Sequence, residues 1–169
     1  ALMAVPGDVD IVIAAELLEA GRAVQRGLVT PDRTTLIASS HRAYAIAEKS
    51  ALGDGRSSSE DTVAALESAA RRFVCADMQD LAEQNKTVIS ASLFGALAGS
   101  GALPFSREQF EAAIRATEKS VSENLAAFAA GFTVAANPTN EVPQAQPPEP
   151  LAWPRSENPA IAALLARAE

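Results

Sequence analysis

The chain has few of the side chains that build metal centres and disulfides. Its 169 residues include one cysteine, Cys75, and one histidine, His41. A single thiol excludes an internal disulfide, and it cannot by itself hold an iron–sulfur cluster or a structural zinc. A metal site would have to be built from carboxylates. Cys75 follows Phe73 and Val74, and this apolar setting predicts an inert core residue rather than a nucleophile.

Positive charge is also scarce. The chain has 14 Lys and Arg against 21 Asp and Glu, a formal net charge of -7. The arginines are interleaved with glutamates, so they form no basic patch that could attract a phosphate backbone. We therefore expect no nucleic-acid partner.

Long hydrophobic runs are missing as well. Residues 87–106 carry no charge, but Gly99, Gly101 and Pro104 interrupt them. A helix that ends near Gly99 would be about 20 Å long, whereas a bilayer core is about 30 Å thick. This segment predicts a buried helix, and we expect a cytoplasmic protein that does not enter a membrane.

Proline is concentrated in one part of the chain. Seven of the ten prolines lie between Pro138 and Pro159. Proline cannot donate to a sheet and disfavours helix before it, so this segment is predicted to be a linker. The expected organisation is one domain over 1–136, a Pro-rich linker over 137–159, and a short terminal helix or tail over 160–169.

The first part of the chain has the pattern of strand, helix, strand. A β-branched run at 9–13 precedes apolar residues at helical spacing, and a second β-rich run lies at 34–38. A right-handed crossover would place the two strands parallel, and 73–75 is predicted to be a third strand. The fold class is α/β: a three-layer α/β/α arrangement with a mainly parallel sheet, incomplete at the N-terminus and followed by C-terminal helices.

Further helices are predicted after residue 57. Ser and acidic residues at 57–61 would cap a helix with Val63, Leu66 and Ala70 on its apolar face. A short helix at 77–84, a buried one at 88–98 and an exposed one at 107–116 should follow. Capping-box spacing occurs at Ser106 with Gln109 and at Ser120 with Glu123, the latter before an apolar face of Leu125, Phe128 and Phe132.

His41 and Arg42 are the candidate ligand-binding residues. They follow the second predicted strand, and open α/β sheets bind ligands at the carboxyl edge. An imidazole beside a guanidinium there suits a carboxylate or phosphate. The alternatives are a surface loop pair, or a histidine that contacts a neighbouring subunit.

Two glycine motifs are better interpreted as turns. Gly53-Asp54-Gly55 with Asn85 imitates the magnesium-binding signature of thiamine diphosphate enzymes, but residues 47–52 do not resemble the buried strand that such a site needs. A glycine turn is the preferred interpretation. Gly99-Ser100-Gly101 lacks the preceding strand of a nucleophile elbow and predicts a helix terminus.

Residues 95–104, Gly-Ala-Leu-Ala-Gly-Ser-Gly-Ala-Leu-Pro, followed by Ser-Arg-Glu at 106–108, resemble a known family. This motif is similar to the end of the gamma-type (or beta-type) subunit of 2-oxoacid:ferredoxin oxidoreductases. Residues 5–22, 27–42 and 48–55 resemble the aerobic indolepyruvate branch, so the resemblance covers roughly 1–135. The family's opening Gly-x-Gly-Gly-Gln-Gly turn is missing, and the chain therefore looks like the C-terminal half of a domain.

The resemblance implies a role within a complex. Such complexes decarboxylate an aryl 2-oxoacid such as indolepyruvate on thiamine diphosphate, pass electrons through iron–sulfur clusters to a ferredoxin-type acceptor, and release an acyl-CoA. Thiamine diphosphate, Mg and the clusters are expected on a partner subunit or domain. The chain itself would hold no cofactor or metal, carry no catalytic residue, and place His41 and Arg42 near substrate or CoA.

Two other classes remain open. The chain could be a non-enzymatic α/β dimerisation or scaffolding module, or a small hydrolase-like or nucleotide-binding enzyme. Ala14-Ala15-Glu16 stands where a phosphate-binding glycine loop would follow Ile13, which argues against nucleotide binding. Self-association is also expected, for two reasons. Open strand edges can pair with another chain. The isolated chain would also expose apolar helix faces to solvent, namely those of 88–98 and of Leu125, Phe128 and Phe132.

Overall fold

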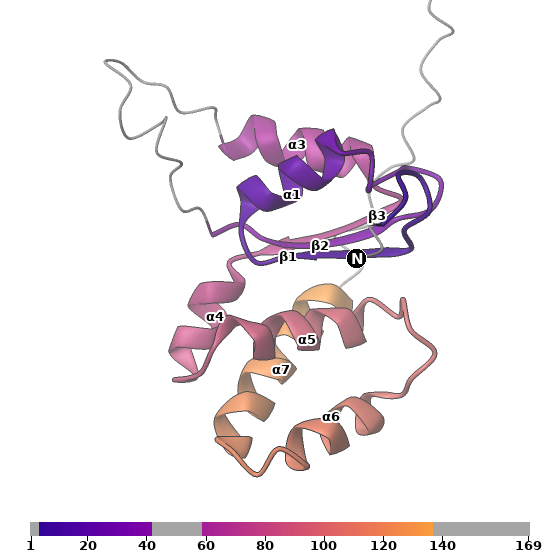
Figure 1. Ribbon diagram of the computed structural model, residues 1–169. Helices are drawn as coiled ribbons and strands as arrows, with labels where there is room; N and C mark the ends of the chain where they lie inside the picture. The colour runs from indigo at the N-terminus through magenta and orange to yellow at the C-terminus, as the bar shows by residue number, and fades with distance from the viewer. Residues whose placement is uncertain (1–3, 42–58, 137–169) are drawn as a thin grey trace, which may run out of the picture.

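The computed structural model describes residues 4–41 and 59–136 (Figure 1). Three parallel strands form one sheet in the order β1-β2-β3: β1 (Ile11–Ala14), β2 (Thr35–Ser39) and β3 (Arg72–Ala76). The three strands predicted from β-branched runs are confirmed, with ends that differ by one or two residues. The predicted linker and tail, 137–159 and 160–169, lie outside the described residues.

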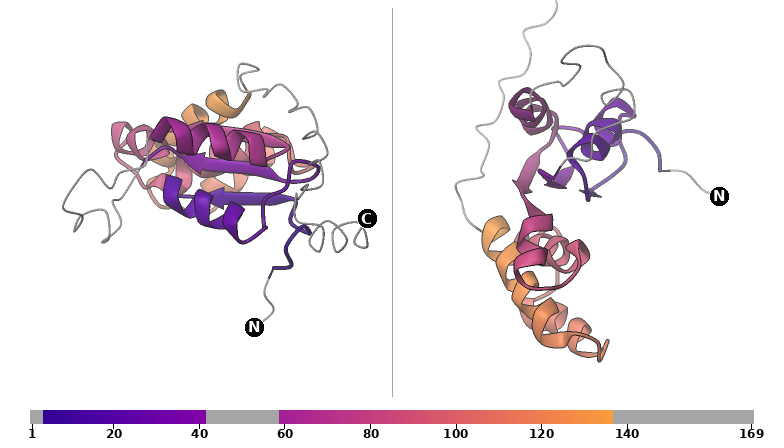
Figure 2. Two further views of the ribbon diagram at one scale, coloured as in Figure 1. Left: turned by 90° about the horizontal axis from the view of Figure 1, so that it is seen from above. Right: turned by 90° about the vertical axis from the view of Figure 1, so that its left-hand side faces the viewer.

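Six helices surround this sheet in the described part of the chain. They are α1 (Leu17–Gln25), α3 (Ser59–Ala69), α4 (Met78–Gln84), α5 (Ile89–Gly99), α6 (Arg107–Arg115) and α7 (Val121–Ala136). Helices α1 and α3 cover one face, and α4, α5 and α7 lie on the other (Figure 1). Helix α6 packs on α5 and α7 at the end farthest from the sheet, as the right-hand view of Figure 2 shows. The α/β fold class is confirmed.

Strand β2 is the centre of the core, and all five of its residues are buried. Because side chains alternate along a strand, it serves both faces of the sheet. Leu36 and Ala38 belong to the cluster under α1 and α3, together with Leu17, Leu66 and Phe73. Ile37 belongs to the cluster on the opposite face, which includes residues of α4, α5 and α7.

Helices α5 and α7 touch through their backbones. A Cβ placed on Gly95 would lie 2.0 Å from the carbonyl oxygen of Phe128, and one on Gly131 would lie 2.0 Å from that of Ser92. This close approach buries Leu93 and Phe128. Much of the apolar surface that was expected to stay exposed in the isolated chain is therefore covered, although Val88 remains 64% exposed and Leu125 and Phe132 are half-buried.

Helix α6 is attached through aromatic packing. The rings of Phe94 and Phe110 meet edge to face with centroids 5.0 Å apart, and Phe128 completes the cluster. The capping box at Ser106 and Gln109 is confirmed: the Gln109 Oε1 accepts the Ser106 N–H at 2.8 Å. This box fixes where α6 begins.

The second expected capping box differs from the prediction. Ser120 has a φ of 44°, in the left-handed region, whereas an N-cap residue normally has extended backbone. Glu123 accepts a hydrogen bond from the Ser122 hydroxyl at 2.9 Å. The spacing alone suggested a box that the local backbone does not form.

Arg72 joins the sheet to the helical layer. Its guanidinium donates to the carbonyl oxygens of Ser100 and, at 3.0 Å, of Ala135. These two carbonyls lie at the C-terminal ends of α5 and α7, where the helix dipole favours a cation. The ends of α5 and α7 are thereby held side by side against β3.

Strand β1 is an edge of the sheet. Its Ile13 side chain is 44% exposed, and Ile11 is half-buried. Neither belongs to the apolar clusters formed by the described residues. None of the helices in the described ranges is both long and apolar enough to cross a bilayer.

Candidate site at the carboxyl edge of the sheet

The three strands end at one edge, and His41, the described member of the predicted pair, follows β2 there. Ala14 pairs with Ala38, and Ser39 pairs with Ala76, so the residues that follow all three strands come together. Helices α1 and α4 both begin at this edge, after Glu16 and Asp77. The positive ends of two helices, one on each face of the sheet, therefore lie at the same carboxyl edge as His41.

A buried serine organises this edge. The hydroxyl of Ser39 is fully buried and accepts the Met78 N–H at 3.1 Å and the His41 N–H at 3.2 Å. One side chain thus fixes both the start of α4 and the loop that leaves β2. Sequence reasoning missed Ser39, and a hydroxyl at the end of an otherwise apolar strand was the available signal.

The main chain of His41 is fixed on both sides. Its N–H is bound to Ser39, and its carbonyl accepts the Leu17 N–H at 3.0 Å. That second bond satisfies the first amide of α1, whose N-cap residue, Glu16, makes no side-chain cap bond. His41 itself is exposed. An exposed imidazole on an immobilised backbone can bind a ligand without a large ordering cost. Arg42, its predicted companion, lies outside the described residues.

Asp77 is used within the fold. Its carboxylate accepts the Asp80 N–H at 2.9 Å and so caps α4. The neighbouring Cys75 thiol is half-buried, and burial, followed by the charge of Asp77, raises its pKa to about 11. Cys75 packs against the cluster under α1 and α3. It is a protonated thiol at neutral pH, which agrees with the predicted inert role.

The thiamine-like motif is only partly described. Gly53, Asp54 and Gly55 lie outside the described residues. Asn85 is the C-cap of α4, and its side-chain amide donates to the Leu81 carbonyl at 2.8 Å. It therefore serves the end of a helix. Within 4–41 and 59–136, no three His, Cys, Asp or Glu side chains are grouped so that they could hold a metal ion.

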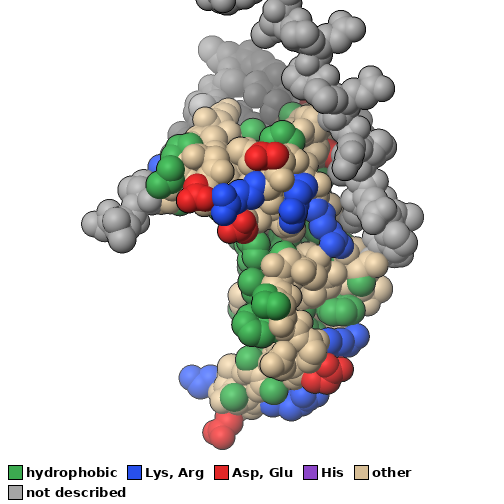
Figure 3. Space-filling model, turned by 90° about the vertical axis from the view of Figure 1, so that its right-hand side faces the viewer, with side chains coloured by type: hydrophobic (Ala, Val, Ile, Leu, Met, Phe, Trp, Pro, Cys, Tyr) green, Lys and Arg blue, Asp and Glu red, His purple; other side chains and the backbone are tan. Residues whose placement is uncertain are grey.

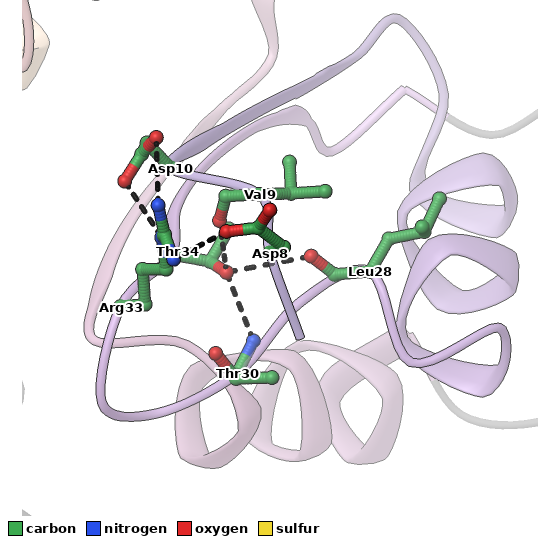
Figure 4. A network of polar contacts seen from close by, with 7 residues as sticks. All are labelled: Asp8, Val9, Asp10, Leu28, Thr30, Arg33 and Thr34. Carbon is green, nitrogen blue, oxygen red and sulfur yellow. Dashed lines mark hydrogen bonds and ion pairs between the residues drawn. The ribbon is translucent and has the colours of Figure 1, made fainter. Parts of the chain in front are cut away.

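The opposite edge of the sheet carries a polar network with a structural role (Figure 4). The Thr34 hydroxyl donates to the Val9 carbonyl at 2.8 Å and accepts the Thr30 N–H at 3.0 Å. Arg33 bridges Asp8 and Asp10, with its Nε 2.8 Å from the Asp10 carboxylate. The hydrogen bond from Arg33 and its charge hold the pKa of Asp10 below the ordinary range. These contacts tie the segment before β1 to the turn before β2.

Comparison with known proteins assigns the fold to a family. The family described as pyruvate ferredoxin/flavodoxin oxidoreductase matches residues 1–134. Comparisons with curated proteins and with solved structures gave no match. The family match covers well over half of the sequence, and the chain therefore belongs to the pyruvate ferredoxin/flavodoxin oxidoreductase family.

Proposed function

We propose that this chain is the subunit or domain without its own cofactor in an indolepyruvate-type oxidoreductase. Family membership indicates a subunit of a 2-oxoacid ferredoxin oxidoreductase, which acts as part of a complex. In the proposal, the complex converts an aryl 2-oxoacid to an acyl-CoA and passes electrons to a ferredoxin-type acceptor. The partner subunit would hold thiamine diphosphate, Mg and iron–sulfur clusters.

We propose that this chain holds no magnesium–diphosphate site of its own. The side-chain amide nitrogen of Asn85 donates to the carbonyl of Leu81 at the end of α4, which supports a structural role for this residue. Asp77, the carboxylate at the sheet's carboxyl edge, caps the same helix through the Asp80 N–H. The chain's own contribution is therefore proposed to be binding and orientation.

The observation that carries the proposal is the way His41 is held. Bonds to Ser39 and Leu17 fix its main chain at the carboxyl edge, next to the first amide of α1, and the residue is exposed. A carboxylate or phosphate presented there would be attracted by the positive end of α1 and could accept a hydrogen bond from the imidazole. We expect this anion to belong to the 2-oxoacid or to CoA, with Arg42 as a second contact.

The partner is proposed to cover the edge strand. Strand β1 has no neighbour on its outer side in the described sheet, and Ile13 exposes 44% of its surface. Apolar surface and open backbone groups at a sheet edge favour pairing with another chain. Self-association through the same edge is the other expected outcome.

The test is activity of the reconstituted complex. The chain should be co-purified with its thiamine and iron–sulfur subunit, and reduction of an artificial acceptor should be measured with indolepyruvate or pyruvate in the presence of CoA. His41→Gln should raise KM for the 2-oxoacid or CoA by roughly 10-fold or more, because a hydrogen bond to a charged group contributes about 1.5–3 kcal/mol. The matched control is Arg26→Gln, at the exposed far end of α1.

Three results would count against the proposal. Unchanged KM values in His41→Gln would remove the binding role of this edge. Turnover of pyruvate but not of indolepyruvate would refute the aryl specificity. Failure to bind any such subunit would favour the scaffolding alternative.

A further inference from the structure

An apolar hollow lies between α5, residues 100–106 and α6, at the end of the molecule away from β1. Its volume is about 380 Å³. The apolar side chains that line it are Phe94, Leu97, Leu103, Phe105, Phe110 and Ala113. Figure 3 shows the side of the molecule that carries the 100–106 loop, where hydrophobic side chains are exposed on the middle part of the surface. Gln109 is the polar residue of the lining.

The lining selects an apolar, ring-shaped occupant. The hollow is open, since Phe105 is 55% exposed and Gln109 and Ala113 are exposed as well. The Oε1 of Gln109 is already engaged by the Ser106 N–H. Phe105 and Phe110 stand edge to face, with centroids 6.1 Å apart, and another aromatic ring could pack against them in the same preferred geometry. Grooves of this kind bind Pro-rich segments, whose restricted backbone lowers the cost of docking.

The chain's own sequence contains such a segment. Residues 147–154 read Pro-Pro-Glu-Pro-Leu-Ala-Trp-Pro and include Trp153, the sole tryptophan of the protein. These residues lie outside those that the structure describes. Leu151 and Trp153 are the large apolar side chains of the Pro-rich stretch that offer the most surface to bury.

The place where α7 ends brings this segment within reach. Arg72 binds the carbonyls of both Ala135 and Ser100. The C-terminal end of α7 therefore lies beside the start of the 100–106 loop, which forms one wall of the hollow. The fourteen residues from 137 to 150 can span up to about 50 Å when extended. A tethered segment also acts at a high effective concentration, in the millimolar range for short linkers.

We propose that residues 151–153 of the same chain dock in this hollow, with Trp153 as the anchor between Phe105 and the wall of α6. The hollow is a different surface from the carboxyl edge of the sheet, so docking there is independent of the proposed oxidoreductase role. In this proposal the Pro-rich segment binds to a defined place on the domain and does not serve only as a linker.

The sole tryptophan makes the test direct in the full chain. We expect blue-shifted emission from Trp153 and protection from acrylamide quenching. Ala113→Glu places a charge on the wall of the hollow and should shift the emission to longer wavelength and raise the quenching constant toward that of N-acetyltryptophanamide. Its matched control is Ala112→Glu, also exposed on α6 but outside the lining, which should leave both unchanged. Circular dichroism checks that each variant is folded.

A second pair of variants guards against an effect on α6 itself. Phe105→Ala removes an exposed ring of the hollow, and Val88→Ala removes an exposed apolar side chain elsewhere, 64% exposed. Only Phe105→Ala should increase quenching. Emission like that of free tryptophan in the unaltered chain would overturn the proposal, and so would shielding that neither hollow variant changes. A blue shift that disappears on dilution would overturn it in favour of a second copy's segment.

Discussion

The contact between α5 and α7 predicts opposite effects of the same substitution at two helical glycines. In Gly131→Ala the new methyl would lie 2.0 Å from the Ser92 carbonyl oxygen and 2.8 Å from its carbon. The shortest ordinary contacts of this type are about 3.3 Å, so the helices must separate by roughly 1 Å. Backbone atoms cannot rotate away as a side chain can, and the cost should therefore lie near the upper end of the overpacking range, about 3 kcal/mol.

Helix propensity works against that cost. Alanine is better than glycine in a helix interior by about 0.5–1 kcal/mol, so the net loss of unfolding free energy in Gly131→Ala should be about 2 kcal/mol. Gly21, inside α1, is the control because a Cβ there meets no atom within 4 Å. Gly21→Ala should be stabilised by about 0.5–1 kcal/mol.

Urea unfolding followed by circular dichroism at equal protein concentration measures both values. The double variant Gly95→Ala with Gly131→Ala should lose less than the sum of the single losses, because one displacement of α7 relieves both contacts. Equal stability of Gly131→Ala and Gly21→Ala would refute the close approach of these helices.

Three further predictions concern single side chains. Ser39→Ala leaves the buried N–H of Met78 and the part-buried N–H of His41 without their acceptor and should cost about 1–3 kcal/mol, with faster hydrogen exchange at those two amides by NMR; unchanged exchange would contradict the role of Ser39 at the carboxyl edge. Because Arg33 lowers the pKa of Asp10, their pair contributes stability at neutral pH that disappears as the pH falls through the folded-state pKa of Asp10, so thermal unfolding of Asp10→Asn and of the unaltered chain should differ at neutral pH and converge once the pH is below that pKa. The Cys75 thiol, with its pKa raised to about 11, should hold roughly 100-fold less thiolate than an exposed cysteine at the same pH, and an aromatic disulfide reagent should modify it rapidly only after unfolding.

The strands and most helices could be predicted because their signals are local. The β-branched runs at 9–13 and 34–38 lie within two residues of β1 and β2, and the Ser106 capping box marks the start of α6. Local spacing failed at Ser120, where the backbone enters the left-handed region and the box does not form. Spacing states which bonds are possible, whereas the approach of the chain to the helix decides whether they are made.

The candidate site was predicted only in position. His41 does follow β2 at the carboxyl edge, but its fixation depends on Ser39, which also binds Met78, 39 residues further along the chain. No local pattern contains that contact. The close contact between the glycines of α5 and those of α7 could not be predicted from local sequence either. The available signal was on α5 alone, where Gly95 and Gly99 lie one helical turn apart, a spacing that allows another helix to approach closely.

The central position of β2 has a consequence for how the domain opens. Leu36 and Ala38 belong to the core on one face and Ile37 to the core on the other, while the strand is paired on both edges. Neither helical layer can detach from the sheet without exposing side chains of this strand. The two layers should therefore unfold as one cooperative unit, and the amides of β2 should exchange with solvent only when the whole domain opens.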